Sequence, residues 1–180
     1  MTFEEKTISS EVVYDGIILK LRKDLVETVN GIPSYREILE HRGGVALVAV
    51  TDDNKLVMVS QFRKPVERVM LEIPAGKIEE DENPMETAIR ELKEETGFTA
   101  KNISLLSRYY PSVGYSCECL YIYLCTGLTP GDTAFDDTEA IDISFMDFKE
   151  AFEKVVNGEI EDGKTALGIM QAYVKLNSLL

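Results

Sequence analysis

The segment from Gly76 to Phe98, GKIEEDENPMETAIRELKEETGF, constrains this chain more than any other part of its sequence. Asn83, Pro84 and Glu86 fit the N-cap, the first helical position and the acid of a capping box. Gly97 can adopt the left-handed conformation that commonly ends a helix. The segment therefore predicts a helix that begins at Pro84 and ends just before Gly97.

The expected helix carries carboxylates beside its buried side. Four apolar residues recur at helical spacing and predict a buried stripe: Met85, Ala88, Ile89 and Leu92. Glu91 and Glu95 lie one turn apart beside this stripe, and Glu94 adjoins them. Like charges at this spacing cost roughly 0.2–0.5 kcal/mol per pair. A hard divalent cation bound by oxygen ligands would offset that repulsion, so the three glutamates indicate a metal site.

An acid-rich helix is also typical of a surface that simply faces solvent. Residues 72–95 contain nine acidic and three basic residues, a net charge of −6. The preceding Leu71–Lys77, LEIPAGK, predicts a strand end followed by a Pro–Gly turn. A strand, a glycine loop and an acid-faced helix in succession favour a site over a solvated surface.

All nine fixed positions between Gly76 and Phe98 match the signature of the Nudix hydrolases, and the chain resembles that family. These are metal-dependent enzymes that cleave nucleoside diphosphates linked to another group. The resemblance implies an α+β fold, the Nudix-type α/β/α sandwich with a mixed β-sheet, and an N-terminal β-strand extension. We expect the extension over residues 1–40 and the Nudix hydrolase domain over residues 41–180. The expected cofactor is Mg²⁺, with Mn²⁺ as a possible substitute.

The resemblance also assigns roles within the Nudix segment, residues 76–98. The expected metal ligands are Glu91, Glu95, Glu94 and the backbone carbonyl of Ala75. The residues expected to have structural roles are Gly76, Glu82, Arg90 and Gly97, with Glu82 and Arg90 forming an ion pair between loop and helix.

Segments outside residues 76–98 resemble the ADP-ribose pyrophosphatase branch of the family. They are Gln61–Arg63, Leu71–Gly76, Tyr110–Glu118 and Gly158–Thr165, the last without evident chemistry. The branch implies hydrolysis of ADP-ribose to AMP and ribose 5-phosphate by activated water. The loop reads Pro-Ser-Val-Gly where the branch often has Ser-Pro-Gly, so another nucleotide sugar or a nucleoside triphosphate is an alternative substrate. A non-catalytic, nucleotide-binding regulatory Nudix module is an alternative of another class, but the three intact glutamates weigh against it.

Six residues are expected to contact substrate: Arg63, Gly114, Ser116, Glu118, Arg36 and Glu37. The planar fork of Arg63 matches phosphate oxygens, although an ion pair with Glu72 is equally compatible. Gly114 and Ser116 would allow the backbone close to a diphosphate. Glu118 would point inward by alternation along a strand over residues 117–125. In the resembling branch, the extension carrying Arg36 and Glu37 crosses to the partner's site; solvent exposure is the alternative for both residues.

The nucleophile is expected to be water, because no Ser–His or Cys–His pair is evident. In the resembling branch, the general base comes from an acidic loop before the last strand. Glu139 occupies that place here, with Glu94 and Glu118 as competitors, and a solvated turn is the alternative for Glu139.

Composition excludes other classes of protein. The net charge of −13 argues against a nucleic-acid polymer as partner, because binding such a polymer requires basic patches. The sequence contains no apolar run long enough to cross a bilayer, and its polar N-terminus is unlike a signal peptide, so no membrane association is expected. The three cysteines, Cys117, Cys119 and Cys125, are an odd number, which fits a reducing compartment and a cytoplasmic location.

The remaining pattern predicts strands on both sides of the Nudix helix and two C-terminal helices. The expected strands cover residues 12–21, 25–29, 34–39, 45–50, 55–61, 103–110, 117–125 and 140–146, with one turn at residues 22–24. The expected helices cover 149–156 and 165–176, the latter with apolar residues at Leu167, Met170 and Val174. The hairpin of residues 25–39 would expose strand edges that a second copy could cover, so a homodimer is expected.

Overall fold

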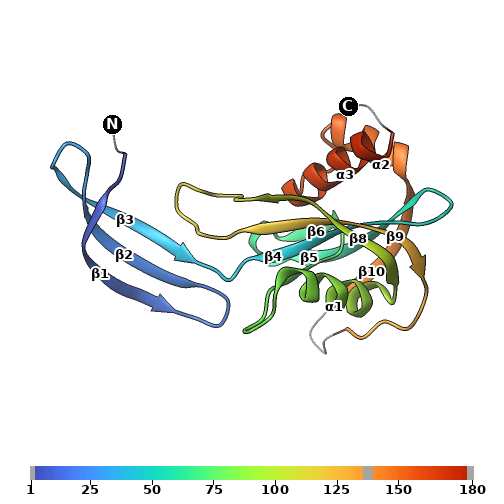
Figure 1. Ribbon diagram of the computed structural model, residues 1–180, viewed down its shortest axis with the longest axis horizontal. Coiled ribbons are helices and arrows are strands. Elements are labelled where there is room, and N and C mark those ends of the chain that lie inside the picture. Colours follow the sequence, from blue (N-terminus) through green and yellow to red (C-terminus); the bar gives the residue numbers. More distant parts are fainter. Residues whose placement is uncertain (1–2, 136–139, 178–180) are drawn as a thin grey trace. The chain divides into compact units, whose positions relative to one another are not determined.

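The computed structural model describes residues 3–135 and 140–177 of the chain. Its contacts divide into two units (Figure 1). The N-terminal unit contains Met1–Gly43 and Tyr110–Cys119, and the core unit contains Gly44–Tyr109 and Leu120–Leu180. Among the described residues, no helix is both long and apolar enough to cross a membrane.

The core unit is built on a mixed sheet of seven strands. The main path runs β10 (Ile141–Asp147), β5 (Lys55–Arg63), β4 (Gly44–Val50), β9 (Leu120–Thr129) and β8 (Thr99–Tyr109). Two further strands, β6 (Arg68–Glu72) and β7 (Ala75–Lys77), pair with β5 and β4 respectively. The β4–β9 pair is parallel, and the other pairs are antiparallel.

Helices cover both faces of this sheet (Figure 1). Helix α1 (Pro84–Thr96) lies on one face, and α2 (Phe148–Val156) and α3 (Gly163–Leu176) lie on the other. Strand β4 is buried along its whole length because it faces both layers. Its Val45, Leu47 and Ala49 pack in the cluster with α1, whereas Ala46, Val48 and Val50 pack in the cluster with α2 and α3. This arrangement confirms the predicted α/β/α sandwich.

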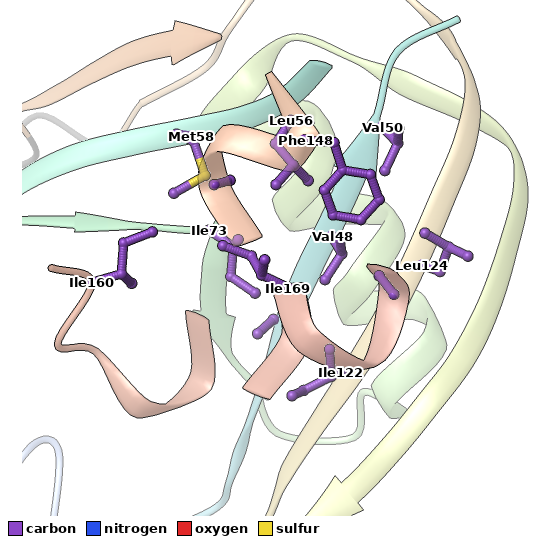
Figure 2. Packing of buried hydrophobic residues seen from close by; sticks show 13 residues of the cluster. Val48, Val50, Leu56, Met58, Ile73, Ile122, Leu124, Phe148, Ile160 and Ile169 are labelled. Carbon is purple, nitrogen blue, oxygen red and sulfur yellow. The ribbon is translucent and has the colours of Figure 1, made fainter. Parts of the chain in front are cut away.

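Figure 2 shows the cluster beneath α2 and α3, where Phe148 and Ile169 lie with Val48 of β4 and with Ile73, which follows β6. Burying each such side chain contributes roughly 1.5–3 kcal/mol. On α3, the buried residues are Thr165, Gly168, Ile169 and Ala172. Of the apolar residues noted on this helix, Met170 is exposed, whereas Leu167 and Val174 are partly buried, with Leu167 packed against the core cluster. Gly168 allows this face to approach the sheet closely, since a Cβ there would lie 2.9 Å from Cγ2 of Val48.

The N-terminal unit is a three-stranded antiparallel sheet with the order β1 (Lys6–Asp15), β2 (Lys20–Glu27) and β3 (Pro33–Glu40). The hairpin expected over residues 25–39 is confirmed as the end of β2, a turn and β3. The turn expected at residues 22–24 is wrong. These residues lie within β2, and the chain turns at Gly16–Leu19, where the Gly16 N–H donates to the Leu19 carbonyl. Asp24 is buried instead, because the Ser10 hydroxyl (2.6 Å) and the Arg22 guanidinium (3.0 Å) satisfy its carboxylate.

Residues 110–119 complete the N-terminal unit. The Leu39 N–H donates to the Tyr115 carbonyl (2.7 Å), and the Cys117 N–H donates to the Leu39 carbonyl (3.0 Å). The strand expected from residue 117 begins only at Leu120, so Glu118 is not a strand residue and the alternation argument for its inward direction fails. The three cysteines are free of disulfides, and burial raises the pKa of the Cys125 thiol to about 12, as suits an unreactive core residue.

Candidate active site

Local sequence fixes both ends of α1. The Asn83 side chain accepts hydrogen bonds from the N–H groups of Met85 (3.0 Å) and Glu86 (3.1 Å), and the Glu86 carboxylate accepts one from the Asn83 N–H (3.1 Å). Gly97 has a φ of 73° and donates to the Lys93 carbonyl (2.8 Å). The predicted helix, with its capping box and its glycine stop, is thereby confirmed.

The buried face of α1 differs from the predicted stripe. Ala88 and Leu92 are buried, but Met85 is 37% exposed and Ile89 is 53% exposed. The face is completed by Thr87, Glu95 and Thr96. Glu95 therefore lies within the buried face, only 4% exposed, and not beside it. Its carboxylate is satisfied there because Oε2 accepts a hydrogen bond from the Ala75 N–H (3.0 Å).

The Glu91 carboxylate packs directly against the glycine of the preceding loop. A Cβ atom at Gly76 would lie 1.8 Å from Cδ of Glu91, a distance that no real contact allows. Any side chain at position 76 would therefore force the Glu91 carboxylate to move. Ala75 and Gly76 thus bring the β7 backbone next to two of the three predicted acidic ligands.

Arg90 joins the acidic residues into one network. Its guanidinium makes a two-pronged ion pair with Glu82, both contacts at 2.9 Å, and also contacts Glu91 (2.8 Å) and Glu94 (2.9 Å). Arg90 also donates to the Lys77 carbonyl (3.2 Å), so the structure contains the expected tie between loop and helix. The hydrogen bond from Arg90 holds the pKa of Glu82 at about 2, and the pKa of Arg90 is raised in return, chiefly by Glu82.

The donor set fits a hard divalent cation. Carboxylate oxygens and a backbone carbonyl are the ligands that Mg²⁺ and Mn²⁺ prefer. Among residues 3–135 and 140–177, however, no three His, Cys, Asp or Glu side chains are arranged closely enough to hold a metal ion. One carboxylate oxygen each of Glu91 and Glu94 accepts a hydrogen bond from Arg90, and one oxygen of Glu95 accepts a hydrogen bond from the Ala75 N–H. Assignment of these residues as ligands therefore remains a prediction.

Arg63 and Glu72 form a second charged group in the core unit. Two guanidinium nitrogens of Arg63 contact the two carboxylate oxygens of Glu72 at 2.6 and 2.7 Å. Lys164 of α3 also pairs with Glu72. Burial alone would raise the pKa of Glu72, but these two cations outweigh it and lower that pKa. The structure thus contains the ion pair that was one of two interpretations of Arg63, and contact with phosphate stays a prediction.

Two of the predicted substrate residues lie on β3 of the N-terminal unit. Arg36 donates to both carboxylate oxygens of Glu5, to the Ser34 hydroxyl and to the Tyr35 carbonyl. The hydrogen bond with Glu5 raises the pKa of Arg36. Glu37 is exposed. Their contact with a nucleotide stays a prediction.

The other three belong to the 110–119 segment of the same unit. Gly114 is exposed, with open space where a Cβ would stand. The Ser116 hydroxyl accepts from the Glu118 N–H (3.1 Å). A Glu118 carboxylate oxygen lies 3.6 Å from Nδ1 of His41. His41 is distant in sequence, and the sequence alone gave it no role.

The predicted general base, Glu139, lies outside the described residues. Described residues on either side of it contact α1 and β5. The Ala134 N–H donates to the Glu94 carbonyl (2.9 Å), and Ile141 pairs with Gln61 at the start of β10.

Sequence reasoning gave no role to Asp162, Lys164 and Thr165, which the structure links to β6. The Thr165 hydroxyl accepts a hydrogen bond from the Ile73 N–H (2.9 Å), and Lys164 reaches Glu72. A usable signal was present, because Asp162 precedes the helix as an N-cap residue and its side chain accepts from the Thr165 N–H.

Comparison with known proteins identifies the architecture around these acids. Residues 40–166 match the family profile described as the NUDIX domain. The chain belongs to the Nudix family. The Nudix fold also appears in a crystal structure of an ADP compounds hydrolase, which superposes with a TM-score of 0.86 at 19% identity over 98% of this chain and 96% of the other.

Two curated relatives are each 41% identical to this chain over the aligned residues. One is the "ADP-ribose pyrophosphatase" of Bacillus subtilis, aligned over 97% of this chain and 95% of its own length. The other is the "Methanol dehydrogenase activator" of Bacillus methanolicus, over 99% and 96%. The "ADP-ribose pyrophosphatase" of Mycobacterium tuberculosis is 35% identical over 93% of this chain and 83% of its own.

Proposed function

We propose that this chain is a divalent-metal-dependent ADP-ribose pyrophosphatase. Water attacks one phosphorus of the diphosphate, the bridging P–O bond breaks, and the products are AMP and ribose 5-phosphate. The observation that carries the proposal is the acidic network on α1, with Glu91, Glu94 and Glu95 around Arg90 and the β7 backbone. The full-length similarity to two ADP-ribose pyrophosphatases supports this substrate.

In this proposal, Glu91, Glu94, Glu95 and the Ala75 carbonyl hold Mg²⁺ or Mn²⁺. Such an ion, when bound, acidifies a water molecule and neutralises charge on the leaving phosphate. Arg90 offsets mutual repulsion among the carboxylates and keeps them gathered between substrate turnovers. Glu139 takes the proton of the attacking water, with Glu94 as the competing base. The anchoring of Ala134 to Glu94 supports Glu139, because it holds the preceding loop against the acidic helix.

Six residues are the proposed substrate contacts. Arg63 would orient a phosphate, with Glu72 fixing the plane of its guanidinium. Gly114, Ser116, Glu118, Arg36 and Glu37 are the proposed contacts from the N-terminal unit. Arg36 would first have to exchange Glu5 for the nucleotide, since its guanidinium is engaged there.

A substrate panel tests the proposal. Purified protein with Mg²⁺ or Mn²⁺ is incubated with ADP-ribose, GDP-mannose and ATP, and the products are separated by ion-exchange chromatography. We expect AMP and ribose 5-phosphate from ADP-ribose, and their loss with chelator or in Glu91→Gln. Rapid cleavage of ATP or GDP-mannose without AMP release from ADP-ribose would refute the substrate assignment. No hydrolysis of any compound would favour the regulatory module.

A second function is favoured by equal identity to the methanol dehydrogenase activator. The chain would then act on a dehydrogenase partner. Adding it to the methanol dehydrogenase of Bacillus methanolicus should raise the rate of methanol oxidation, with that organism's activator as the positive control. An unchanged rate would eliminate this function, and Glu91→Gln would show whether activation needs the acidic site.

We also propose that the N-terminal unit forms a homodimer with a second copy. All ten residues of β1 are exposed, and exposed apolar side chains gather in this unit: Ile8, Val12, Val13, Tyr14, Ile17, Ile18, Val29, Ile32 and Tyr35. Strand edges and apolar surface of this kind usually mark an interaction site. A two-fold dimer would cover them and give two equivalent active sites.

Light scattering over a dilution series tests the dimer. The expected mass is twice the 20.2 kDa of the chain. Val12→Lys should favour the monomer, whereas Val66→Lys, at a similarly exposed apolar residue of the core unit, should not. A fully active monomer at micromolar concentration would rule out a shared active site.

A cytoplasmic location is proposed as well, supported by the three free cysteines. Cell fractionation with an antibody against the chain tests it, and recovery outside the cytoplasmic fraction would refute it.

A further inference from the structure

The chain crosses between two strands immediately before the Nudix segment. Strands β4 and β5 pair at Val50 and Leu56. Further along, β6 pairs with β5 and β7 pairs with β4, so Ile73 and Pro74 form a crossover between the two strands. Proline has no N–H, and its carbonyl accepts from the Leu47 N–H (2.8 Å). The backbone donor of this crossover is therefore the N–H of Ile73.

Helix α3 supplies the acceptor for that donor. The Thr165 hydroxyl, fully buried, accepts from the Ile73 N–H at 2.9 Å and donates to Oδ2 of Asp162 at 2.5 Å. The same Asp162 oxygen accepts from the Thr165 N–H (3.0 Å). Gly168, one turn further along α3, allows the close approach, since a Cβ there would lie 3.0 Å from Cδ1 of Ile73. Figure 2 shows Ile73 and Ile169 of α3 in the same cluster.

The residue before the crossover is held by the same helix end. Lys164 pairs with Glu72 and lies 2.9 Å from Oδ2 of Asp162. Glu72 is 2% exposed and also carries the two-pronged pair with Arg63. The two cations hold the Glu72 carboxylate in place, because moving it would leave charges unpaired in a buried site, which is energetically costly.

The residues after the crossover contact the acids of α1. Ala75 donates its N–H to Glu95, and Gly76 lies against the Glu91 carboxylate. A shift of Ile73 would therefore be transmitted over two or three residues to both carboxylates. We propose that Thr165, together with Asp162 and Lys164, is a positioning residue of the Nudix site. It fixes the crossover whose backbone sets the places of Glu91 and Glu95. The rate measurements that test this proposal rest on the proposed hydrolase function.

A purely structural role would produce a different result. Asp162 and Thr165 stabilise the start of α3, and loss of a helix cap lowers stability by itself. Asp147 offers a matched control, because it caps α2 by accepting from the N–H groups of Lys149 (2.9 Å) and Glu150 (3.1 Å). It belongs to none of the contacts that lead to Glu91 or Glu95. If Thr165 acts only through stability, the two helix starts should behave alike.

The test compares Thr165→Val, Thr165→Ser and Asp147→Ala. We expect Thr165→Val to lower kcat and the affinity for Mn²⁺, each by about 10–100-fold, as loss of a group that orients metal ligands commonly does. The substrate KM should change less. Thr165→Ser keeps the hydroxyl and should restore most of both quantities. Asp147→Ala should lower the melting temperature and leave kcat and Mn²⁺ affinity unchanged.

Mn²⁺ binding is measured by electron paramagnetic resonance without substrate, so this arm does not depend on the identity of the substrate. Rates are measured on whichever nucleotide the wild type cleaves, and absence of AMP from ADP-ribose would overturn only the substrate assignment. Unchanged kcat and Mn²⁺ affinity in Thr165→Val would overturn the positioning role. Equal losses in Asp147→Ala would overturn it too. If Thr165→Val does not fold, Lys164→Met should show the same losses, with rescue by Lys164→Arg, and wild-type behaviour of Lys164→Met would refute the proposal.

Discussion

Replacing Gly76 with alanine should remove most of the hydrolase activity while the chain remains folded. The added Cβ would lie 1.8 Å from Cδ and 1.9 Å from Oε1 of Glu91. Since ordinary contact for a Cβ begins at 3.4 Å, the carboxylate must move by about 1.6 Å. That movement also separates Glu91 from Arg90, which it contacts at 2.8 Å.

The magnitude follows from this displacement. Misplacement of a catalytic group by about 1 Å can lower the rate about 100-fold, which corresponds to roughly 2.7 kcal/mol. The effect on stability should be smaller. Gly76 is not among the glycines with positive φ, so alanine can adopt its backbone conformation. The entropic gain of about 0.4–1 kcal/mol from Gly→Ala then offsets a rotamer cost of about 0.5–1.5 kcal/mol at Glu91.

The assay is kcat/KM for nucleotide release, with thermal unfolding of the same samples. Gly163→Ala is the matched control, because a Cβ there would meet nothing within 4 Å. A double-mutant cycle with Glu91→Gln tests the cause. The double variant should have the same kcat/KM as Glu91→Gln alone, because both changes remove the same function, that of the Glu91 carboxylate. Wild-type kcat/KM in Gly76→Ala, or losses that add in the double variant, would refute the reasoning.

Three further changes test the charged networks. Glu95→Gln should lower the rate at limiting Mg²⁺ by about 10–100-fold, because it removes a charged metal ligand. The melting temperature should change little, because the Gln amide oxygen can still accept the hydrogen bond from the Ala75 N–H. An unchanged rate would contradict the assignment of Glu95 as a metal ligand. Glu72→Ala should lower the free energy of unfolding by about 1.5–3 kcal/mol, because Arg63 and Lys164 lose a buried charged partner while Lys164 keeps Asp162. An unchanged midpoint in urea titration would contradict this. Glu82 has its pKa lowered from 4.5 to about 2 by Arg90, so its stabilisation is complete above pH 4.5 and disappears as the pH falls to about 2. Glu82→Gln should therefore be less stable than wild type at neutral pH, and a difference in melting temperature that stayed constant down to pH 2 would contradict the shift.

Sequence reasoning succeeded where short-range contacts decide the structure. The ends of α1 depend on Asn83, Glu86 and Gly97, all within one turn of the helix ends. The sandwich followed from the family resemblance. The strand order could not be read from the sequence, because the parallel β4–β9 pair joins residues separated by most of the core unit.

The error on the buried face of α1 comes from the use of apolar side chains alone to locate that face, and α3 shows the same limit. On α1, Ile89 is exposed and Thr87 is buried, because the Thr87 hydroxyl donates to Glu82 (2.8 Å). On α3, the small residues Gly168 and Ala172 are buried in place of Met170. Binding sites commonly depart from the hydrophobic pattern in this way, because polar partners offset the cost of burial.

The three glutamates of α1 are held with different degrees of freedom, and this difference bears on their roles. Glu95, itself buried, is held by the backbone N–H of Ala75, and the Glu91 side chain, 12% exposed, is confined by Gly76. The Glu94 side chain is 40% exposed, and one contact with Arg90 at 2.9 Å holds it. A metal ligand benefits from a fixed position, whereas a group that accepts a proton must change partners during the reaction. This ordering supports Glu91 and Glu95 as the ligands that define the metal site, and it makes Glu94 the member of the set best able to serve as ligand or base.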